Sequence, residues 1–321
     1  MSSWDMIDSN ITISVLMPAY NAAEYIREAI DSILNQTFTN FEFVIINDGS
    51  TDATEDVILN YSDERIQYYA NECNMGIVKT LNRGIDLCRG KYIARMDADD
   101  ISYPERLRKQ MQYMEANPHV VACGCLYAIY GKEHLGAVDV ATSAEDIRME
   151  TALYCQFAHS TLMMRKSILE ENSLRYRDAY RHAEDYKLWT ELLGLGDMIN
   201  LPEVLHAIRQ CEEGISIVYS KEQKQMANQV RKDYLKQMGI DVETTLNDLQ
   251  QQDMSLSKTT EVLDAYLPLI RQCDKNLWIR KNYVSTIKQM LKKINRFERV
   301  EMIKRYNSVL STKDKIAILI K

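Results

Sequence analysis

Residues 92–100 read YIARMDADD, a short apolar run that ends in three acidic side chains. The run Tyr92–Met96 has the length and apolar character of a buried strand, and the acids follow it at once. Because Asp97 and Asp99 flank a single small residue, their carboxylates can lie close together just beyond the strand. Hard oxygen ligands of this kind suit Mg²⁺ or Mn²⁺. A turn that caps the next helix is the alternative, although Asp100 can cap without help from Asp97.

Short strands and longer helices alternate on the N-terminal side of this run. The other predicted strands are Ile11–Met17, Phe41–Asn47 and Ile66–Ala70, and the predicted helices between the strands are Ala22–Asn35, Asp52–Tyr61 and Gly76–Cys88. Such alternation is typical of βαβ units. It predicts an α/β fold with a Rossmann-like, mainly parallel sheet flanked by helices.

The pattern changes twice beyond Ala98. The regular alternation breaks first, with a strand predicted at Val120–Ile129 and helices at Pro104–Asn117, Ser143–Tyr154 and Ala183–Leu193. From about Tyr219 onward only helical spacing of apolar residues remains. We therefore expect the sheet topology to change after Ala98 and an all-helical C-terminal region to follow.

Polar residues follow three of the predicted strands, at the edge where parallel sheets bind ligands. Ile11–Met17 is followed by PAYN, Phe41–Asn47 by DGSTD, and Tyr92–Met96 by DADD. Asp48, the first residue after its strand, can form an Asx turn or accept a hydrogen bond from the N–H of a nucleobase. Spacing alone leaves both interpretations open.

The composition sets the size class and the compartment. The chain of 321 residues is 46% hydrophobic, enough for one full-sized α/β domain and a smaller appendage. No run reaches the roughly 18 apolar residues of a membrane-spanning helix, and Met1–Asn10 lacks the features of a secretory signal. We therefore expect a cytoplasmic protein. Its seven cysteines include no CxxC pair, which predicts reduced thiols rather than disulfides or a zinc site.

The charge is unevenly distributed along the chain. The net charge of −7 argues against nucleic acid as a partner, yet Arg271–Lys321 holds fourteen basic and four acidic residues. We expect the helices of this segment to form a basic surface that binds the anionic inner face of a membrane, a partner chain or a second copy of the protein. A solvated helix face packed on the main domain is the alternative. The basic residues around its apolar stripe are Lys288, Lys292, Lys293, Arg296 and Arg299.

Four motifs, in this order, resemble the family 2 glycosyltransferases of the GT-A fold, of the bacterial polysaccharide type. They are VLMPAYNAAEYI at 15–26, IINDGSTD at 45–52, NMG at 74–76 with LNRGI at 81–85, and ARMDADD at 94–100. The resemblance extends from Ile11 to Ser216 and leaves the helical region uncovered. It implies a GT-A glycosyltransferase domain at 11–216 and a helical C-terminal region at 217–321.

The resemblance also implies a reaction and a donor site. The reaction is an inverting transfer of a sugar from a nucleotide diphosphate donor, expected to be a UDP-sugar, to an acceptor hydroxyl. Asp48 would hold the base, and Asp97 and Asp99 would hold the ribose and a Mn²⁺ or Mg²⁺ ion that bridges the diphosphate. The other donor-site residues implied are Pro18, Tyr20, Glu24, Lys79, Asn82 and Arg83. For Arg83 the alternative is a solvated helix charge.

Two downstream segments also resemble this family. FAHSTLMMRK begins at Phe157, and HAEDYKLW begins at His182 with two acids at the start of a predicted helix. The resemblance makes Asp185 the general base that deprotonates the acceptor, while Glu184 orients the acceptor or caps the helix. Acids at a helix start also simply complement the helix dipole. Trp189 has two interpretations, stacking on an acceptor sugar or packing in the core.

One position departs from the family pattern. Relatives often carry a histidine in the segment that corresponds to Ile208–Ser216, and Cys211 stands there in this chain. If that histidine helps to hold metal or diphosphate, this chain lacks the ligand, uses the softer Cys211, or uses His159 or His206. We therefore include His159 among the candidate metal ligands.

Two other functions stay open on the sequence alone. A catalytically silent nucleotide-sugar-binding protein would account for Cys211. A phosphotransferase of the haloacid dehalogenase type also carries Asp-x-Asp after a strand, although normally after the first strand. For a transferase, we expect a saccharide or lipid-linked acceptor from surface polysaccharide or glycoconjugate synthesis. The sugar and the linkage are not encoded in any readable pattern.

Overall fold

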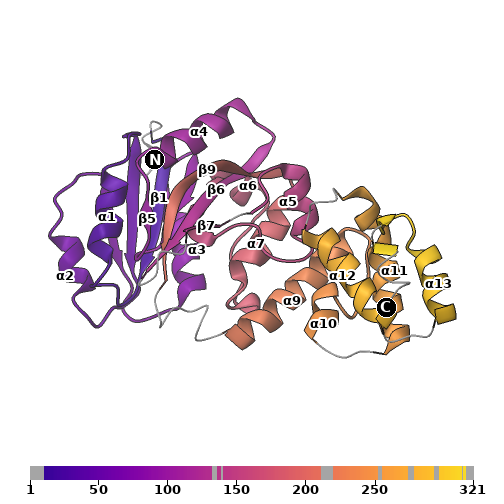
Figure 1. Ribbon diagram of the computed structural model, residues 1–321. Helices are drawn as coiled ribbons and strands as arrows, with labels where there is room; N and C mark the ends of the chain where they lie inside the picture. Colours follow the sequence, from indigo (N-terminus) through magenta and orange to yellow (C-terminus); the bar gives the residue numbers. More distant parts are fainter. Residues whose placement is uncertain are drawn as a thin grey trace. The chain divides into compact units, whose positions relative to one another are not determined.

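The computed structural model describes residues 11–131, 136–138, 140–210, 220–251, 255–273, 278–292, 296–312 and 314–315. These residues form a nine-stranded sheet flanked by helices, and further helices follow it (Figure 1). The predicted α/β class with a helical C-terminal region is confirmed. The strands are β1 Ile13–Ala19, β2 Phe41–Asn47, β3 Ile66–Ala70, β4 Tyr92–Arg95, β5 Ile101–Ser102, β6 Val120–Tyr130, β7 Gly136–Val138, β8 Met163–Arg165 and β9 Asp197–Arg209.

The sheet consists of a parallel half and a mixed half. The strand order is β3-β2-β1-β4-β8-β6-β9-β5, with β7 paired to β6. The first four strands in this order are parallel to one another, and β8 then pairs with β4 in the antiparallel direction. In the second half, β6 and β9 are parallel, and β5 and β7 lie antiparallel to their partners. The predicted change of topology after Ala98 is confirmed.

The parallel half brings the ends of three strands to one edge. Every residue of β1 and β2 is buried, as expected of strands that helices cover on both faces. The register pairs Ala19 with Asn47, so the residues that follow them, Tyr20 and Asp48, leave the sheet side by side. Because β4 is parallel to β1 on its other side, Asp97 follows at the same edge.

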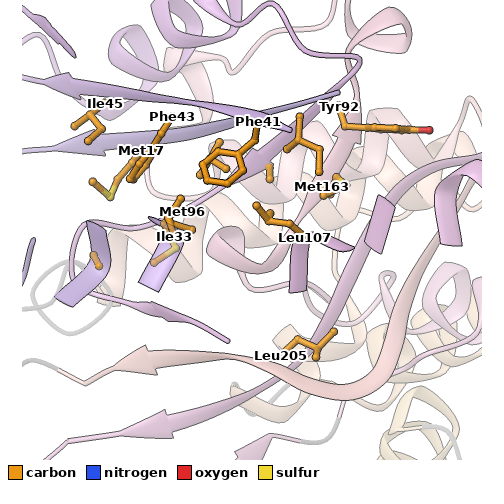
Figure 2. Packing of buried hydrophobic residues seen from close by; sticks show 14 of the residues in the cluster. Met17, Ile33, Phe41, Phe43, Ile45, Tyr92, Met96, Leu107, Met163 and Leu205 are labelled. Atoms are coloured by element: carbon orange, nitrogen blue, oxygen red, sulfur yellow. The ribbon is translucent and has the colours of Figure 1, made fainter. Parts of the chain in front are cut away.

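Helices cover both faces of the sheet. The main apolar cluster joins the strands to α1 and α4, and Figure 2 shows Met17 and Ile45, which are register partners, together with Ile33 of α1 and Leu107 of α4. The buried residues of α1 recur at helical spacing, as the sequence predicts. The helices and 3₁₀ turns around the sheet are α1 Ile26–Leu34, α2 Thr54–Leu59, α3 Ile77–Leu87, α4 Arg106–Ala116, η1 His159–Thr161, α6 Lys166–Glu171, η2 Asp178–Tyr180 and α7 Glu184–Leu193.

A glycine lets α3 approach the sheet closely. A Cβ atom on Gly84 would collide with the Leu16 side chain and would lie 3.1 Å from Ile46 Cδ1. Leu16 and Ile46 alternate along their strands with the residues of the main cluster, so α3 packs on the opposite face of the sheet. The glycine of the LNRGI motif is therefore a packing requirement.

The longest strand, β9, is absent from the elements that the sequence predicts. It contains Pro202, which cannot donate a hydrogen bond to a neighbouring strand. In the pairing of β6 with β9, Cys125 lies opposite Leu201, whereas the next residue of β6 lies opposite Val204. Pro202 and Glu203 therefore fall in a bulge that removes the proline from the ladder.

The chain divides into two compact units. The first comprises Met1–Ala144 with Gln156–Met226 and contains the sheet, and the second comprises Glu145–Cys155 with Ala227–Lys321. The described helices that belong to the second unit, in whole or in part, are α5 Ala144–Glu150, α9 Ser220–Gln237, α10 Leu246–Gln251, α11 Leu256–Gln272, α12 Trp278–Lys292 and α13 Arg296–Arg305.

Three residues of the short segment Glu145–Cys155 form hydrogen bonds with later helices of the second unit. Arg231 Nε donates to the Leu153 carbonyl at 2.6 Å, and the Tyr234 hydroxyl donates to the Arg148 carbonyl at 2.9 Å. The Glu150 carboxylate accepts from the backbone N–H of Ile279 at 3.1 Å. The second unit is thus assembled from two pieces of chain that are far apart in sequence.

The predicted basic surface can be followed only in part. Lys288 forms an ion pair with Asp314, and the side chains of Lys292, Lys293 and Arg296 lie outside the described residues. Arg299 is half-buried. No described helix combines the length and apolarity needed to cross a membrane. The six described cysteines are free thiols, as predicted.

Candidate active site

Three carboxylates gather where β4 ends. Asp97, Asp99 and Asp100 each place one carboxylate oxygen within 4.8 Å of the others. Asp97 and Asp99 are partly exposed, whereas Asp100 is buried. Burial, reinforced by the charges of Asp97 and Asp100, raises the pKa of Asp99 to about 7. Oxygen ligands this close together, with mutual repulsion to relieve, fit a hard divalent cation.

A buried arginine lies beside the cluster. Arg95 is 3% exposed and forms an ion pair with Asp97. Burial raises the pKa of Asp97, and the Arg95 charge opposes that effect. Arg95 Nε has no hydrogen-bond partner among the described residues. One cation inside the protein therefore offsets part of the negative charge of the three acids.

Asp100 differs from its two neighbours because both of its oxygens are bonded to the protein. Oδ2 accepts from the Ser160 hydroxyl at 2.5 Å and lies 3.1 Å from His206 Nε2, while Oδ1 accepts from the Arg209 backbone N–H at 3.0 Å. Burial alone would raise the pKa of Asp100, but the bonds from His206 and Ser160 hold it below its usual value. Asp97 and Asp99 are thus the carboxylates left to meet a ligand.

Asp48 holds the loop that precedes α3. Its Oδ1 accepts from Asn71 Nδ2 at 2.6 Å and from the Met75 backbone N–H at 2.9 Å, and Oδ2 accepts from Gly76 N–H at 3.0 Å. The Asx-turn interpretation does not hold for Asp48, because the backbone N–H of Ser50 donates to the neighbouring asparagine instead. With a single bond on Oδ2, the carboxylate keeps capacity for one more donor.

The residues after β1 provide an exposed aromatic ring and an acid. Pro18 is buried in β1, Tyr20 is 47% exposed and Glu24 is exposed. The backbone here is held to the loop after β2, with Asn21 N–H donating to the Ser50 hydroxyl at 3.0 Å. Tyr20 therefore lies next to Asp48 at the sheet edge with an accessible side chain.

The three candidate residues of α3 have different environments. Lys79 is exposed. Arg83 donates to the Ala70 carbonyl at 2.8 Å and to Asn71, so it is bonded and is not a solvated helix charge. Asn82 forms two bonds with the backbone of Tyr176, donating to its carbonyl and accepting from its N–H, both at 2.9 Å. Asn82 thus fixes a distant segment rather than leaving its amide free.

The two acidic residues at the start of α7 have raised pKa values. Burial, together with the charge of Glu184, raises the pKa of Asp185 to about 7. Asp185 is partly exposed, whereas Glu184 is 8% exposed and has an oxygen without a hydrogen-bond partner among the described residues. A carboxylate with a pKa near neutrality is suited to proton transfer.

Aromatic residues pack beside this acidic pair. Trp189 is 1% exposed, and its ring lies 5.7 Å from the ring of His159 and 6.3 Å from that of Tyr176. Of its two interpretations, core packing is therefore the correct one. His159 Nε2 lies 2.9 Å from the Tyr176 hydroxyl, and His159 is not part of the carboxylate group at β4. Cys211 lies outside the described residues.

Sequence reasoning assigned no role to several residues of the site. Arg95, Arg106, Ser160 and Tyr176 all contact the carboxylates or their supports. Arg95 and Ser160 lie in segments quoted for the resemblance to other proteins, whereas Arg106 and Tyr176 do not. Arg95 offers the clearest signal, since an arginine inside an apolar strand is rarely buried without a charged partner. The long-range contacts of Ser160 and Tyr176 leave no trace in local sequence spacing.

Comparison with known proteins gives this site a family. The model of the family Glycosyl transferase family 2 matches residues 14–172. A glycosyltransferase of Haemophilus influenzae is 33% identical over 314 residues, an alignment that covers 88% of this chain and 97% of the relative. The chain is a family 2 glycosyltransferase. This membership argues against the haloacid dehalogenase alternative and against a silent binding protein.

Other relatives of the glycosyltransferase include one with a named pathway. The amylovoran biosynthesis glycosyltransferase AmsE of Erwinia amylovora is 32% identical over 205 residues, covering 61% of this chain and 75% of AmsE. The Haemophilus influenzae alignment covers 88% of this chain, more than residues 1–216 could supply, so it includes part of the helical C-terminal region.

Solved structures show the same fold at low identity. S. aureus TarS residues 1–349, in complex with UDP-GlcNAc, superimposes with a TM-score of 0.58 at 15% identity and covers 96% of this chain and 90% of TarS. The mannosyltransferase PcManGT of Pyrobaculum calidifontis, in complex with GDP-Man and Mn²⁺, gives a TM-score of 0.56 at 17% identity, with coverages of 96% and 84%. These likenesses confirm the GT-A fold of the glycosyltransferase.

Proposed function

We propose that the glycosyltransferase moves a sugar from a UDP-sugar to an acceptor hydroxyl, with inversion at the anomeric carbon, in surface polysaccharide or glycoconjugate synthesis. The UDP-GlcNAc of the TarS complex and the polysaccharide named for AmsE support the donor class and the pathway. The catalytic domain is 11–216, and 217–321 is the helical region to which Glu145–Cys155 adds a piece. The protein acts in the cytoplasm or on the inner face of the membrane.

The observation that carries this proposal is the meeting of two acidic groups around Tyr176. After burial, the charges of Asp185, Glu184 and Asp97 all contribute to raising the pKa of the Tyr176 hydroxyl. Charge effects of this kind weaken with distance, which supports a position of the end of β4 and the start of α7 near one side chain. With these assignments the donor site and the acceptor base would be neighbours, as direct transfer between bound substrates requires.

The donor half uses the carboxylates at β4. Asp97 and Asp99 would hold Mn²⁺ or Mg²⁺, which neutralises the charge that develops on the leaving diphosphate. Asp48 accepts a hydrogen bond from the base, and Tyr20 covers the base with its exposed ring. The rest of the nucleotide site is lined by Pro18, Glu24, Lys79 and Arg83. Asn82 acts indirectly, because its amide holds the backbone of Tyr176. His159 supports Tyr176 and stays a candidate ligand only if it rotates toward the metal.

The acceptor half uses the start of α7. Asp185 takes the proton of the acceptor hydroxyl as its oxygen attacks the anomeric carbon on the side opposite the diphosphate. Glu184, which has one oxygen with no partner among the described residues, orients the acceptor by accepting a hydrogen bond from a second hydroxyl. Successive helix residues point about 100° apart, so the two acids serve different atoms.

Donor hydrolysis tests the function without knowledge of the acceptor. Nucleotide sugars are first screened for thermal stabilisation in Mn²⁺, with GDP-mannose as the competing class. The best donor is then hydrolysed slowly by the enzyme, and NMR records the anomer of the released sugar before mutarotation. We expect stabilisation by a UDP-sugar and inversion. A preference for GDP-mannose would overturn the donor class, and a retained configuration would overturn the mechanism.

A further inference from the structure

A buried polar network holds both ends of the turn that carries Asp97 and Asp99. Before the turn, Arg106 Nη2 donates to the Arg95 carbonyl at 2.7 Å. After it, Arg209 Nε donates to the Asp99 carbonyl at 3.0 Å. The turn is therefore held from outside its own backbone at two places.

A chain of side chains connects these two ends through the interior. Arg106 Nη1 lies 3.3 Å from His206 Nδ1, and His206 Nε2 lies 3.1 Å from Asp100 Oδ2. A guanidinium only donates, so Nδ1 accepts and the hydrogen of this neutral imidazole is on Nε2, directed at Asp100. Ser160 adds a second donor to the same oxygen at 2.5 Å.

The burial of this network makes it rigid. Asp100, Ser160, His206 and Arg106 are each at most 2% exposed. A buried carboxylate that loses a hydrogen-bond donor is still removed from water, so the loss costs free energy. Each hydrogen bond of the network therefore favours the one arrangement of the turn in which all of them form. Both oxygens of Asp100 accept hydrogen bonds from the protein, two on Oδ2 and one on Oδ1, whereas no such set holds Asp97 or Asp99 among the described residues.

We propose that Ser160, His206 and Arg106 are positioning residues for the metal-binding pair Asp97 and Asp99, and that they act through Asp100 and the Arg95 carbonyl. In this assignment Asp100 is the anchor of the motif and not a third metal ligand. The inference rests on the proposed metal role of Asp97 and Asp99. Supports of this kind, placed behind the ligands, fix the ligand geometry before the ion arrives.

Two serines provide a matched test. Ser160 donates to buried Asp100 at 2.5 Å, and Ser14, at the start of β1, donates to buried Glu42 at 2.6 Å. Both serines are at most 1% exposed. Mn²⁺ is titrated into wild type, Ser160→Ala and Ser14→Ala with and without UDP, and EPR measures the free ion. Ser160→Ala should weaken Mn²⁺ binding by about 10- to 100-fold, and Ser14→Ala should leave it unchanged.

The opposite assignment predicts the opposite sign. If Asp100 is a metal ligand, Ser160→Ala frees a lone pair of its Oδ2, and Mn²⁺ affinity stays the same or rises. Equal weakening in Ser160→Ala and Ser14→Ala would show a general loss of stability and would also overturn the positioning role. Thermal melts of both variants, which should decrease alike, check that the two deletions are comparable.

His206 tests the proposal by rescue. Gln places an oxygen and an N–H donor close to the positions of Nδ1 and Nε2, so His206→Gln should keep most of the Mn²⁺ affinity that His206→Leu loses. Equal affinity in these two variants contradicts the positioning role while leaving the metal site intact. If Asp99→Asn binds Mn²⁺ as wild type does, the metal site itself fails, and the positioning role fails with it.

Discussion

The environment of Asp185 suits a general base. Its side chain is only partly exposed, and Glu184 is its neighbour, and both features raise its pKa. A carboxylate in water is too weak a base to deprotonate an alcohol efficiently at neutral pH, and efficiency is best when the pKa lies near the working pH. Burial and Glu184 together place the pKa of Asp185 at about 7. The same burial makes ionised Asp185 a destabilising group in the folded enzyme.

Asp185→Asn should therefore separate chemistry from stability. Turnover should fall by about 10²-fold or more because the base is lost. Stability should not fall: the wild-type carboxyl favours folding below its unfolded pKa near 4, and this contribution is lost as pH rises through about 7. At pH 8 the neutral variant should thus melt at or above the wild-type temperature. Asp56→Asn, in the first turn of α2, controls for lost helix-dipole stabilisation.

The pH dependence of the wild type gives an independent check. Because Asp185 must be ionised to act, kcat/KM should rise about tenfold per pH unit below about 7 and level off above it. A profile that is flat from pH 5 to 8 would contradict the assignment of Asp185 as the base.

Asn82 should affect catalysis although its amide is engaged by the protein. Asn82→Asp keeps the acceptor for the Tyr176 N–H but places a carboxylate oxygen against the Tyr176 carbonyl. We expect a loss of about 1–3 kcal/mol of stability, with a decrease in kcat because the charges of both acidic groups act on Tyr176. Asn172→Asp, which removes an exposed side-chain bond within one helix, serves as the control. If the two substitutions change stability and kcat equally, Asn82 is not part of the site.

At the scale of elements, Gly84 allows a close contact of α3 with β1. Gly84→Ala should destabilise the fold by about 1–3 kcal/mol, because its methyl group meets Leu16 and the strand cannot move away. Leu16→Ala in the same chain opens room for that methyl group. Urea unfolding of the two single variants and the double variant should show a double variant less destabilised than the sum of the singles. Simple additivity would refute the contact.

How far the sequence predicts these elements depends on their environment. β2 and β3 have the predicted bounds, because buried parallel strands are continuous apolar runs between polar turns. The sequence does not predict β9, because a proline such as Pro202 argues against a strand. The structure accommodates Pro202 in the bulge opposite β6. The sequence predicts that Asp97 and Asp99 lie close together because both are local to one motif, and their carboxylates are close in the structure. Asp100 and His206, which are in contact, are 106 residues apart in the sequence, so no local spacing predicts this contact.

At the scale of the whole molecule, the helical unit is incomplete without Glu145–Cys155. Removing 227–321 would expose Ile147 and Leu153, which are 0% and 2% exposed in the intact chain. The truncated protein should bind a dye for apolar surfaces and be cut by protease within 145–155. Replacing 145–155 by a Gly-Ser linker in the same truncation should reverse both effects. A truncated chain that binds no dye would show that this segment does not depend on the later helices.

The division of the second unit also governs the order of events during synthesis. Glu150 emerges from the ribosome 129 residues before its partner Ile279, which at about 5–20 residues per second is a delay on the order of ten seconds. Throughout that interval Ile147 and Leu153 have been made and their partners have not. The nascent chain therefore offers a short apolar stretch to any chaperone at the exit tunnel, located between the strands of the donor half and the helix that bears Asp185.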